Sequence, residues 1–133
     1  TRRLTGSELM NWVEKNNRRI WTFRVSDKFG DSGLTGLVGV EWDNRQIQMT
    51  DFLLSCRVMG RKIEETMLHV AYEFGRVLNL ETLAACYLKT KKNCPCYTFW
   101  KNSGFKHDDK KNTFTWKIED LYPQPECITI INQ

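Results

Sequence analysis

Residues 54–64 read Leu-Ser-Cys-Arg-Val-Met-Gly-Arg-Lys-Ile-Glu, and they join a predicted strand at 46–55 to a predicted amphipathic helix at 60–78. A helix that begins after such a turn has unpaired N–H groups in its first turn, and the positive end of its dipole lies there. Arg57, Arg61 and Lys62 add full positive charges at the same point. The stretch therefore predicts a binding site for a phosphate-bearing ligand.

The segments around this turn predict one α+β domain. Thr5 and Glu8 have the spacing of a capping box, which predicts a helix to about residue 16. Segments rich in β-branched and aromatic residues predict a meander of strands at residues 20–27, 34–42 and 46–55. A nearly unbroken apolar run predicts a buried strand at 83–88, parallel to the strand at 46–55. The remaining expected elements are a helix at 95–102, a mobile polar loop at 107–112, and strands at 114–118 and 127–131.

The composition is that of a soluble globular domain. The 133 residues are 41% hydrophobic and 27% charged, so the chain is long enough to bury a core without disulfide staples. No apolar run approaches the ~20 residues of a membrane span, and no signal peptide is visible. The net charge of +4 is scattered in small groups, whereas a nucleic-acid binder concentrates positive charge in a stripe. We therefore expect neither a nucleic-acid partner nor a membrane partner.

The cysteines indicate a reducing compartment. Their number, five, is odd, and their spacing is not that of a disulfide framework. We therefore expect free thiols and a cytoplasmic location. Cys94 and Cys96 flank a proline and could begin a zinc site. Zinc needs two more ligands close together, and His69 and His107 each stand alone, so we expect no metal.

Two motifs flank the helix and strand that follow the turn, one at residues 57–62 and one at residues 93–105. With the order of elements, they resemble the two motifs of the GNAT acyltransferase family. Arg57 and Gly60 match fixed positions of the first motif, and Lys62 stands where the family has a small residue. The positions in register with the second motif are Asn93, Phe99, Gly104 and Phe105. The resemblance implies a GNAT-like α+β fold, with a mixed central sheet, flanking helices and a turn that grips the pyrophosphate of coenzyme A.

A narrower resemblance covers nearly the whole chain. The stretches at 1–3, 27–33, 54–61 and 92–95 are similar to the C-terminal GNAT-like domain of FkbH-like proteins. Those proteins join a HAD-type, phosphatase-like domain to this one, and they are implicated in loading a glyceryl unit onto an acyl carrier protein toward methoxymalonyl-type extender units. The resemblance implies that residues 1–133 are one domain and that an acyl carrier protein is its partner. It also implies a HAD-type domain before Thr1 in a longer polypeptide, an expectation that fits a first residue other than Met.

The expected site residues follow from the turn and from this resemblance. Coenzyme A or a phosphopantetheine thioester is expected to bind at Arg57, Gly60, Arg61, Lys62 and Asn93. Cys56 is the candidate nucleophile, because the positive field of the turn would lower the pKa of its thiol, and a thiolate can carry an acyl group as a thioester. The alternative is that Cys56 is a small buried residue.

The resemblance also bears on the general acid. GNAT enzymes often place a Tyr where this sequence has Trp100, and an indole cannot supply a proton at neutral pH. Tyr97 lies one helical turn earlier and is the candidate acid. The alternative is that Tyr97 and Trp100 only pack or line a channel. We expect a structural role for His69, and we expect Asp27 and Asp31 to stabilise their turn.

Three functions follow from these alternatives. The first is an acyltransferase that moves a glyceryl or acyl group to an acyl carrier protein. The second is a non-catalytic module that docks the phosphopantetheine arm, which the missing Tyr favours. The third is a coenzyme A-dependent N-acetyltransferase, which Lys62 and Trp100 disfavour.

Overall fold

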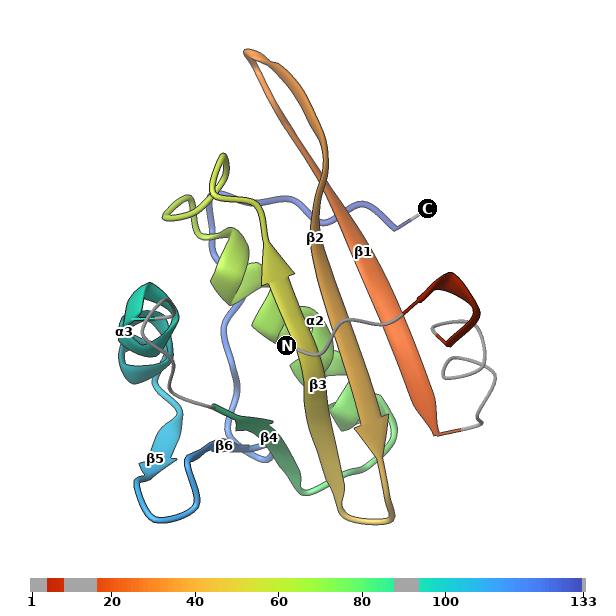
Figure 1. Cartoon of the computed structure of the whole chain (residues 1–133), viewed down its shortest axis with the longest axis vertical. Coiled ribbons are helices and arrows are strands. Elements are labelled where there is room, and N and C mark those ends of the chain that lie inside the picture. The colour runs from red at the N-terminus through yellow and green to blue at the C-terminus, as the bar shows by residue number, and fades with distance from the viewer. Residues whose placement is uncertain (1–4, 9–16, 88–93, 133) are drawn as a thin grey trace.

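The computed structural model describes residues 5–8, 17–87 and 94–132, which form a mixed sheet with helices beside it (Figure 1). The strands are β1 (Arg18–Asp27), β2 (Gly30–Trp42), β3 (Gln46–Leu54), β4 (Thr82–Cys86), β5 (Lys106–Asp108) and β6 (Thr113–Lys117). The helices are α2 (Ile63–Val77) and α3 (Cys94–Asn102), and residues 6–8 are also helical.

The N-terminal capping box is present. The backbone N–H of Thr5 donates to Glu8 Oε2 at 2.7 Å, and the backbone N–H of Glu8 donates to Thr5 Oγ1 at 3.3 Å. The helix expected after it covers residues 9–16, which lie outside the described residues. No helix in the described part of the chain is long and apolar enough to cross a membrane.

The described strands have the order β1-β2-β3-β4-β6-β5. The first three pair antiparallel as a meander, and β3 then pairs in parallel with β4, as the sequence predicted. Helix α2 makes the connection between β3 and β4 and lies across one face of the sheet (Figure 1). The expected α+β fold with a mixed central sheet is therefore confirmed.

The core lies between α2 and the sheet. The fully buried side chains that share its main cluster include Val38, Val40, Ile47, Met67, Leu68, Ala71, Leu83 and Phe114. Gly75 lets the helix approach the strands closely, because a Cβ at this position would lie 2.8 Å from Ile118 Cδ1 and 3.0 Å from Ile47 Cγ2. Close packing of this kind fixes where α2 begins and ends relative to the sheet.

A bulge divides β3 into two halves. Met49 pairs with Val40 and Asp51 pairs with Gly39, so Thr50 has no partner residue on β2. On the other side, β3 pairs with β4 only through Gln46–Met49. Residues 50–54 therefore have no described strand beside them on that side, and β3 and β4 part from each other after the bulge. Bulges bend a strand and increase its twist, which accounts for the parting.

Three boundary expectations are corrected by the structure. The helix expected at 60–78 begins at Ile63, because Gly60 and Lys62 have φ values of 75° and 64°, which do not continue an α-helix. Residues 127–131 form no strand, and Ile128 is held instead by local hydrogen bonds to Gln124 and Pro125. The polar loop expected at 107–112 begins inside β5, which pairs with β6 and stacks His107 on Phe114 at a centroid distance of 4.3 Å.

Candidate functional site

The turn before α2, which we call the anion turn, comprises residues 56–62. It is anchored to the protein just before its first residue and in its middle. The backbone N–H of Ser55 donates to Thr35 O at 2.7 Å, and the side chain of Val58 is fully buried in the core. The turn is thus held in place by β2 and the core, while its polar residues face outward.

The first turn of α2 leaves several amides free. Lys62 is the N-cap residue, and its side chain has no atom that can accept a hydrogen bond, so it cannot cap the helix. The backbone amides of residues 61–65 have no hydrogen-bond acceptor among the described residues. Free amides and the positive end of a helix dipole are groups that bind anions, and the phosphate site expected here stays a prediction.

One amide of the turn is occupied by the protein itself. The backbone N–H of Gly60 donates to Glu64 Oε1 at 2.8 Å. Glu64 is only 8% exposed, and its Oε2 is buried without a hydrogen-bond partner. The expectation that Gly60 presents a bare amide to the ligand is therefore wrong, because a carboxylate four residues later already accepts its hydrogen.

The cations of the turn are largely paired. Arg61 forms an ion pair with Asp27, and Lys62 Nζ lies 3.6 Å from Glu65 Oε1. The backbone N–H of Phe29 and the guanidinium of Arg61 hold the pKa of Asp27 below its ordinary value. Arg57 donates through Nε to Ser55 Oγ at 3.2 Å and has no carboxylate partner among the described residues. Arg57 is therefore the cation that is most available to a ligand.

Cys56 is exposed at the first position of the anion turn. The alternative that it is a small core residue is therefore wrong. Its position directly before Arg57 places a thiol in the same short loop as the first of the free amides. The sequence-predicted residues Cys56, Arg57, Gly60, Arg61 and Lys62 thus share one loop.

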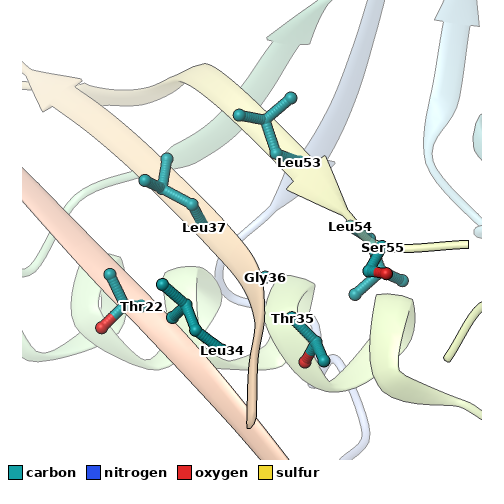
Figure 2. Close-up of a pocket in the computed structure, with 8 residues that line it drawn as sticks. All are labelled: Thr22, Leu34, Thr35, Gly36, Leu37, Leu53, Leu54 and Ser55. Carbon is teal, nitrogen blue, oxygen red and sulfur yellow. The ribbon is translucent and has the colours of Figure 1, made fainter. Parts of the chain in front are cut away.

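An apolar hollow of about 330 Å³ lies next to the turn on the sheet (Figure 2). Gly36 lies against Met67 of α2, and the alternation of side chains along β2 therefore turns Leu37 to the opposite face. Figure 2 shows Leu37 and Leu53 on that opposite face, and Ser55 at one end of the hollow. Leu53 is 45% exposed, so no described residue covers this part of the sheet.

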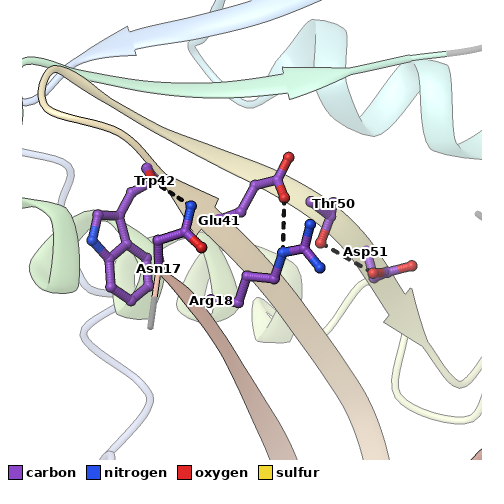
Figure 3. A network of polar contacts seen from close by, with 6 residues as sticks. All are labelled: Asn17, Arg18, Glu41, Trp42, Thr50 and Asp51. Carbon is purple, nitrogen blue, oxygen red and sulfur yellow. Dashed lines mark hydrogen bonds and ion pairs between the residues drawn. The ribbon is translucent and has the colours of Figure 1, made fainter. Parts of the chain in front are cut away.

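Polar side chains lie at the bulge of β3 (Figure 3). Thr50 Oγ1 donates to Asp51 Oδ2 at 3.1 Å, and both side chains lean over Gly39, where a Cβ would lie 3.1 Å from each of their oxygens. Arg18 and Glu41 form an ion pair of 3.1 Å further along the sheet. The sequence analysis missed Asp51, because nothing in the residue pattern marked a bulge at Thr50.

Aromatic side chains pack together where β3 and β4 separate. Phe52 of β3 stacks on Phe99 of α3 with a centroid distance of 5.7 Å and an interplanar angle of 14°. Trp100 is buried and packs on the same phenyl ring. Tyr97 is half-buried, and its ring contacts Tyr87, His107 and Phe114. These rings form a wall, which fits the packing interpretation of Tyr97 and Trp100, and the acid role of Tyr97 stays a prediction.

The remaining candidates have structural contacts or lie outside the described residues. His69 Nδ1 lies 2.8 Å from the carbonyl oxygen of Tyr122, which supports its structural role. Asp31 Oδ1 accepts from Gly33 N–H at 2.6 Å and stabilises its turn, as expected. Asn93 lies outside the described residues. Among the residues that are described, no group of three or more His, Cys, Asp or Glu could hold a metal ion.

No protein-family model matches the sequence, and no curated protein matches it either. Solved structures do match. The PaiA N-acetyltransferase from Thermoplasma acidophilum, in complex with coenzyme A, has a TM-score of 0.67 at 17% identity over 84% of this chain and 70% of that one. A GNAT-family acetyltransferase from Staphylococcus aureus has a TM-score of 0.66 at 11% identity over 84% and 75%. Spermidine N-acetyltransferase from Vibrio cholerae has a TM-score of 0.60 at 18% identity over 84% and 73%.

These matches show the fold. The chain has the fold of the GNAT acetyltransferases. The strand order of the sheet and the similarity to solved structures both confirm the expected GNAT-like α+β architecture.

Proposed function

We propose that this chain is a GNAT-like acyltransferase domain that works with an acyl carrier protein, in glyceryl transfer toward a methoxymalonyl-type extender unit. The observation that carries the proposal is the exposed Cys56 directly before a turn with free amides. The thiol suits a thioester, and the amides suit the phosphate at the other end of a phosphopantetheine arm. The proposed cofactor is therefore coenzyme A or a phosphopantetheine thioester.

The chemistry assigned to Cys56 is thioester exchange. Cys56 Sγ, as a thiolate, attacks the carbonyl carbon of the donor thioester and forms a new carbon–sulfur bond. The bond between that carbon and the donor sulfur breaks, and the departing thiolate takes up a proton. In the second half, the thiol of a carrier-bound arm attacks the Cys56 thioester, and Cys56 Sγ leaves.

The surroundings of Cys56 assign roles to the other groups. Arg57 and the free amides of residues 61–65 would hold the phosphate of the arm. The stacked rings of Phe52 and Phe99 would lie beside an arm that enters where β3 and β4 part. A HAD-type domain in the same polypeptide is the proposed source of the glyceryl unit.

The test uses a glyceryl thioester of pantetheine and measures the intact mass of the protein. The proposal predicts one glyceryl adduct that maps to Cys56 and that holo acyl carrier protein removes. Cys56→Ser should abolish the adduct, whereas Cys127→Ser, which changes another exposed cysteine, should not. No adduct on the wild-type protein, or an adduct unchanged in Cys56→Ser, would refute covalent catalysis at this residue.

The docking alternative is favoured by a specific observation. Trp100 is buried and Tyr97 packs against other rings, so neither side chain presents an acid to the turn. A module that only docks the arm would bind holo acyl carrier protein, and carrier loading by the full polypeptide would be the same with Cys56→Ser. That result would support the docking function and contradict covalent catalysis by this domain.

The N-acetyltransferase alternative is favoured by Asp51. Its carboxylate lies on the open face of the sheet at the bulge, where it could accept a proton from an amine. The PaiA enzyme among the neighbours is named as an N-acetyltransferase. Turnover of acetyl-coenzyme A with an amine, lost in Asp51→Asn and kept in Cys56→Ser, would establish this function instead.

A further inference from the structure

The cations of the anion turn face an equal number of carboxylates from residues outside the turn. Arg57, Arg61 and Lys62 supply the positive charges, and the carboxylates that face them are those of Asp27, Glu64 and Glu65. Two of these carboxylates are paired with cations of the turn, and the third, from Glu64, lies inside the turn. The turn therefore offers little excess positive charge to a ligand.

Glu64 occupies the centre of this arrangement. It accepts the amide hydrogen of Gly60, so it lies beside the place where a bound phosphate would meet the free amides. Its side chain is buried, which weakens solvent screening and strengthens any repulsion between its charge and the ligand. Each additional negative charge on the ligand is repelled again by the same carboxylate.

The second oxygen of Glu64 points to a ligand of a particular kind. Oε2 is buried and has no donor, and a buried acceptor without a partner is costly. A ligand that brings a hydroxyl or amide N–H next to its phosphate would satisfy this oxygen. The pantetheine arm has both groups beyond its phosphate.

We propose that Glu64 determines the specificity of the anion turn, favouring the single phosphodiester of a carrier-bound pantetheine arm over the diphosphate of free coenzyme A. This inference rests on the proposed function, since it concerns the same phosphate site. A phosphodiester brings one negative charge to the turn, and a diphosphate diester brings two. Lys62, which stands in place of a small residue, favours the diphosphate, and its pairing with Glu65 weakens that opposite effect.

The test compares two ligands, pantetheine 4′-methylphosphodiester and dephospho-coenzyme A, by calorimetry. Glu64→Gln keeps an oxygen that can accept the Gly60 hydrogen but removes the charge. The variant should strengthen binding of both ligands, and it should strengthen binding of dephospho-coenzyme A by a further factor of about five to ten, the effect of one additional unit charge. The ratio of the two dissociation constants is therefore the readout, and the adenosine contribution cancels when variant and wild type are compared.

Glu65→Gln is the matched control, since it removes the neighbouring carboxylate that pairs with Lys62 on the outside of the helix. It should change the ratio much less than Glu64→Gln does. Glu64→Ala serves as a second charge-removing variant if Glu64→Gln does not fold, and the thermal unfolding of each variant is recorded.

An unchanged ratio in a folded Glu64 variant would overturn the inference, as would an equal effect of Glu65→Gln. If the wild type binds the methylphosphodiester and the ratio does not change, the proposed function stands and the inference about Glu64 falls. If neither ligand binds to the wild type or to any variant, both fall together.

Discussion

Arg61 and Asp27 form an ion pair across 34 residues of sequence, and this pair joins the anion turn to the tip of the β1–β2 hairpin. The same Asp27 carboxylate accepts the backbone N–H of Phe29 at 2.8 Å, which fixes the hairpin turn. One carboxylate thus orders both the hairpin and the guanidinium of the turn. Arg61 is thereby turned toward the hairpin rather than left free for a ligand.

The first prediction concerns the pH dependence of this link. The pKa of Asp27 is lowered in the folded state, so its contribution to the free energy of unfolding is present above the ordinary Asp value and is lost as the pH falls through the lowered pKa. Asp27→Asn should therefore be less stable than the wild type at pH 7, and the difference should shrink below about pH 4. Urea unfolding at several pH values measures this difference.

Asp120→Asn is the control for that experiment, because the Asp120 carboxylate has no ion pair among the described residues. Its difference from the wild type should be small at every pH. A difference for Asp27→Asn that is the same at pH 7 and at about pH 2.5 would show that the charge of Asp27 does not stabilise the fold.

The second prediction concerns the contact of α2 with the sheet. Gly75→Ala gains about 1 kcal/mol of helix propensity but places a Cβ against Ile118 and Ile47, whose side chains are buried. Overpacking of this kind costs about 1–3 kcal/mol, so we expect a net loss of about 1 kcal/mol in the free energy of unfolding. Denaturant unfolding measures it.

Gly36→Ala provides the comparison. A Cβ at Gly36 would lie 3.1 Å from Met67 Sδ, at the end of a flexible side chain, and 3.3 Å from Phe23 Cβ, so its closest contacts are longer than the 2.8 Å and 3.0 Å at Gly75. The steric cost should therefore be smaller at Gly36 than at Gly75. A variant Gly75→Ala that is more stable than the wild type would contradict the close approach of helix and sheet.

The third prediction concerns the aromatic wall between β3 and α3. Phe52 and Phe99 stack at 5.7 Å, so a double-mutant cycle with Phe52→Leu and Phe99→Leu should give a coupling energy of about 1 kcal/mol. The cycle of Phe52→Leu with Phe29→Leu should be additive, because Phe29 is exposed at the hairpin tip. A coupling near zero for the first pair would mean that the stacking of these rings does not stabilise the contact between β3 and α3.

The fold was largely predictable because its elements carry regular patterns. The β-branched and aromatic residues of β1 to β3 placed these strands within a few residues. The unbroken apolar run at β4 predicted its parallel pairing with β3. The β5 strand was missed because polar residues at a sheet edge resemble a loop. Residues 127–131 have a strand-like composition but no partner strand, and composition alone does not supply one.

The site was predictable only where it is contiguous in sequence. Cys56, Arg57 and Gly60 lie in one loop, so their proximity could be predicted without knowledge of the fold. The cap that Glu64 places on Gly60 depends on the direction of a side chain, and the pairing of Arg61 with Asp27 depends on where a hairpin projects. Neither relationship is visible in the spacing of residues.

The last prediction concerns Tyr122, which fixes the segment after β6 against the core. Its hydroxyl donates to Ser103 O at 3.0 Å, and its ring packs on Trp116 at a centroid distance of 5.0 Å. Tyr122→Phe keeps the ring and removes the hydrogen bond, so at pH 7 we expect a loss of about 1 kcal/mol in the free energy of unfolding.

At alkaline pH the wild type should lose its advantage in stability over Tyr122→Phe. Burial raises the pKa of the Tyr122 hydroxyl, so its ionisation is easier in the unfolded chain, and the wild type should lose stability as the pH rises above about 10. Tyr122→Phe lacks this loss, so the difference between the two proteins should shrink from pH 7 to about pH 11. A difference that stays constant over this range would mean that the Tyr122 hydroxyl ionises as readily in the folded protein as in the unfolded chain, contrary to its burial between α2, β6 and the Ser103 carbonyl.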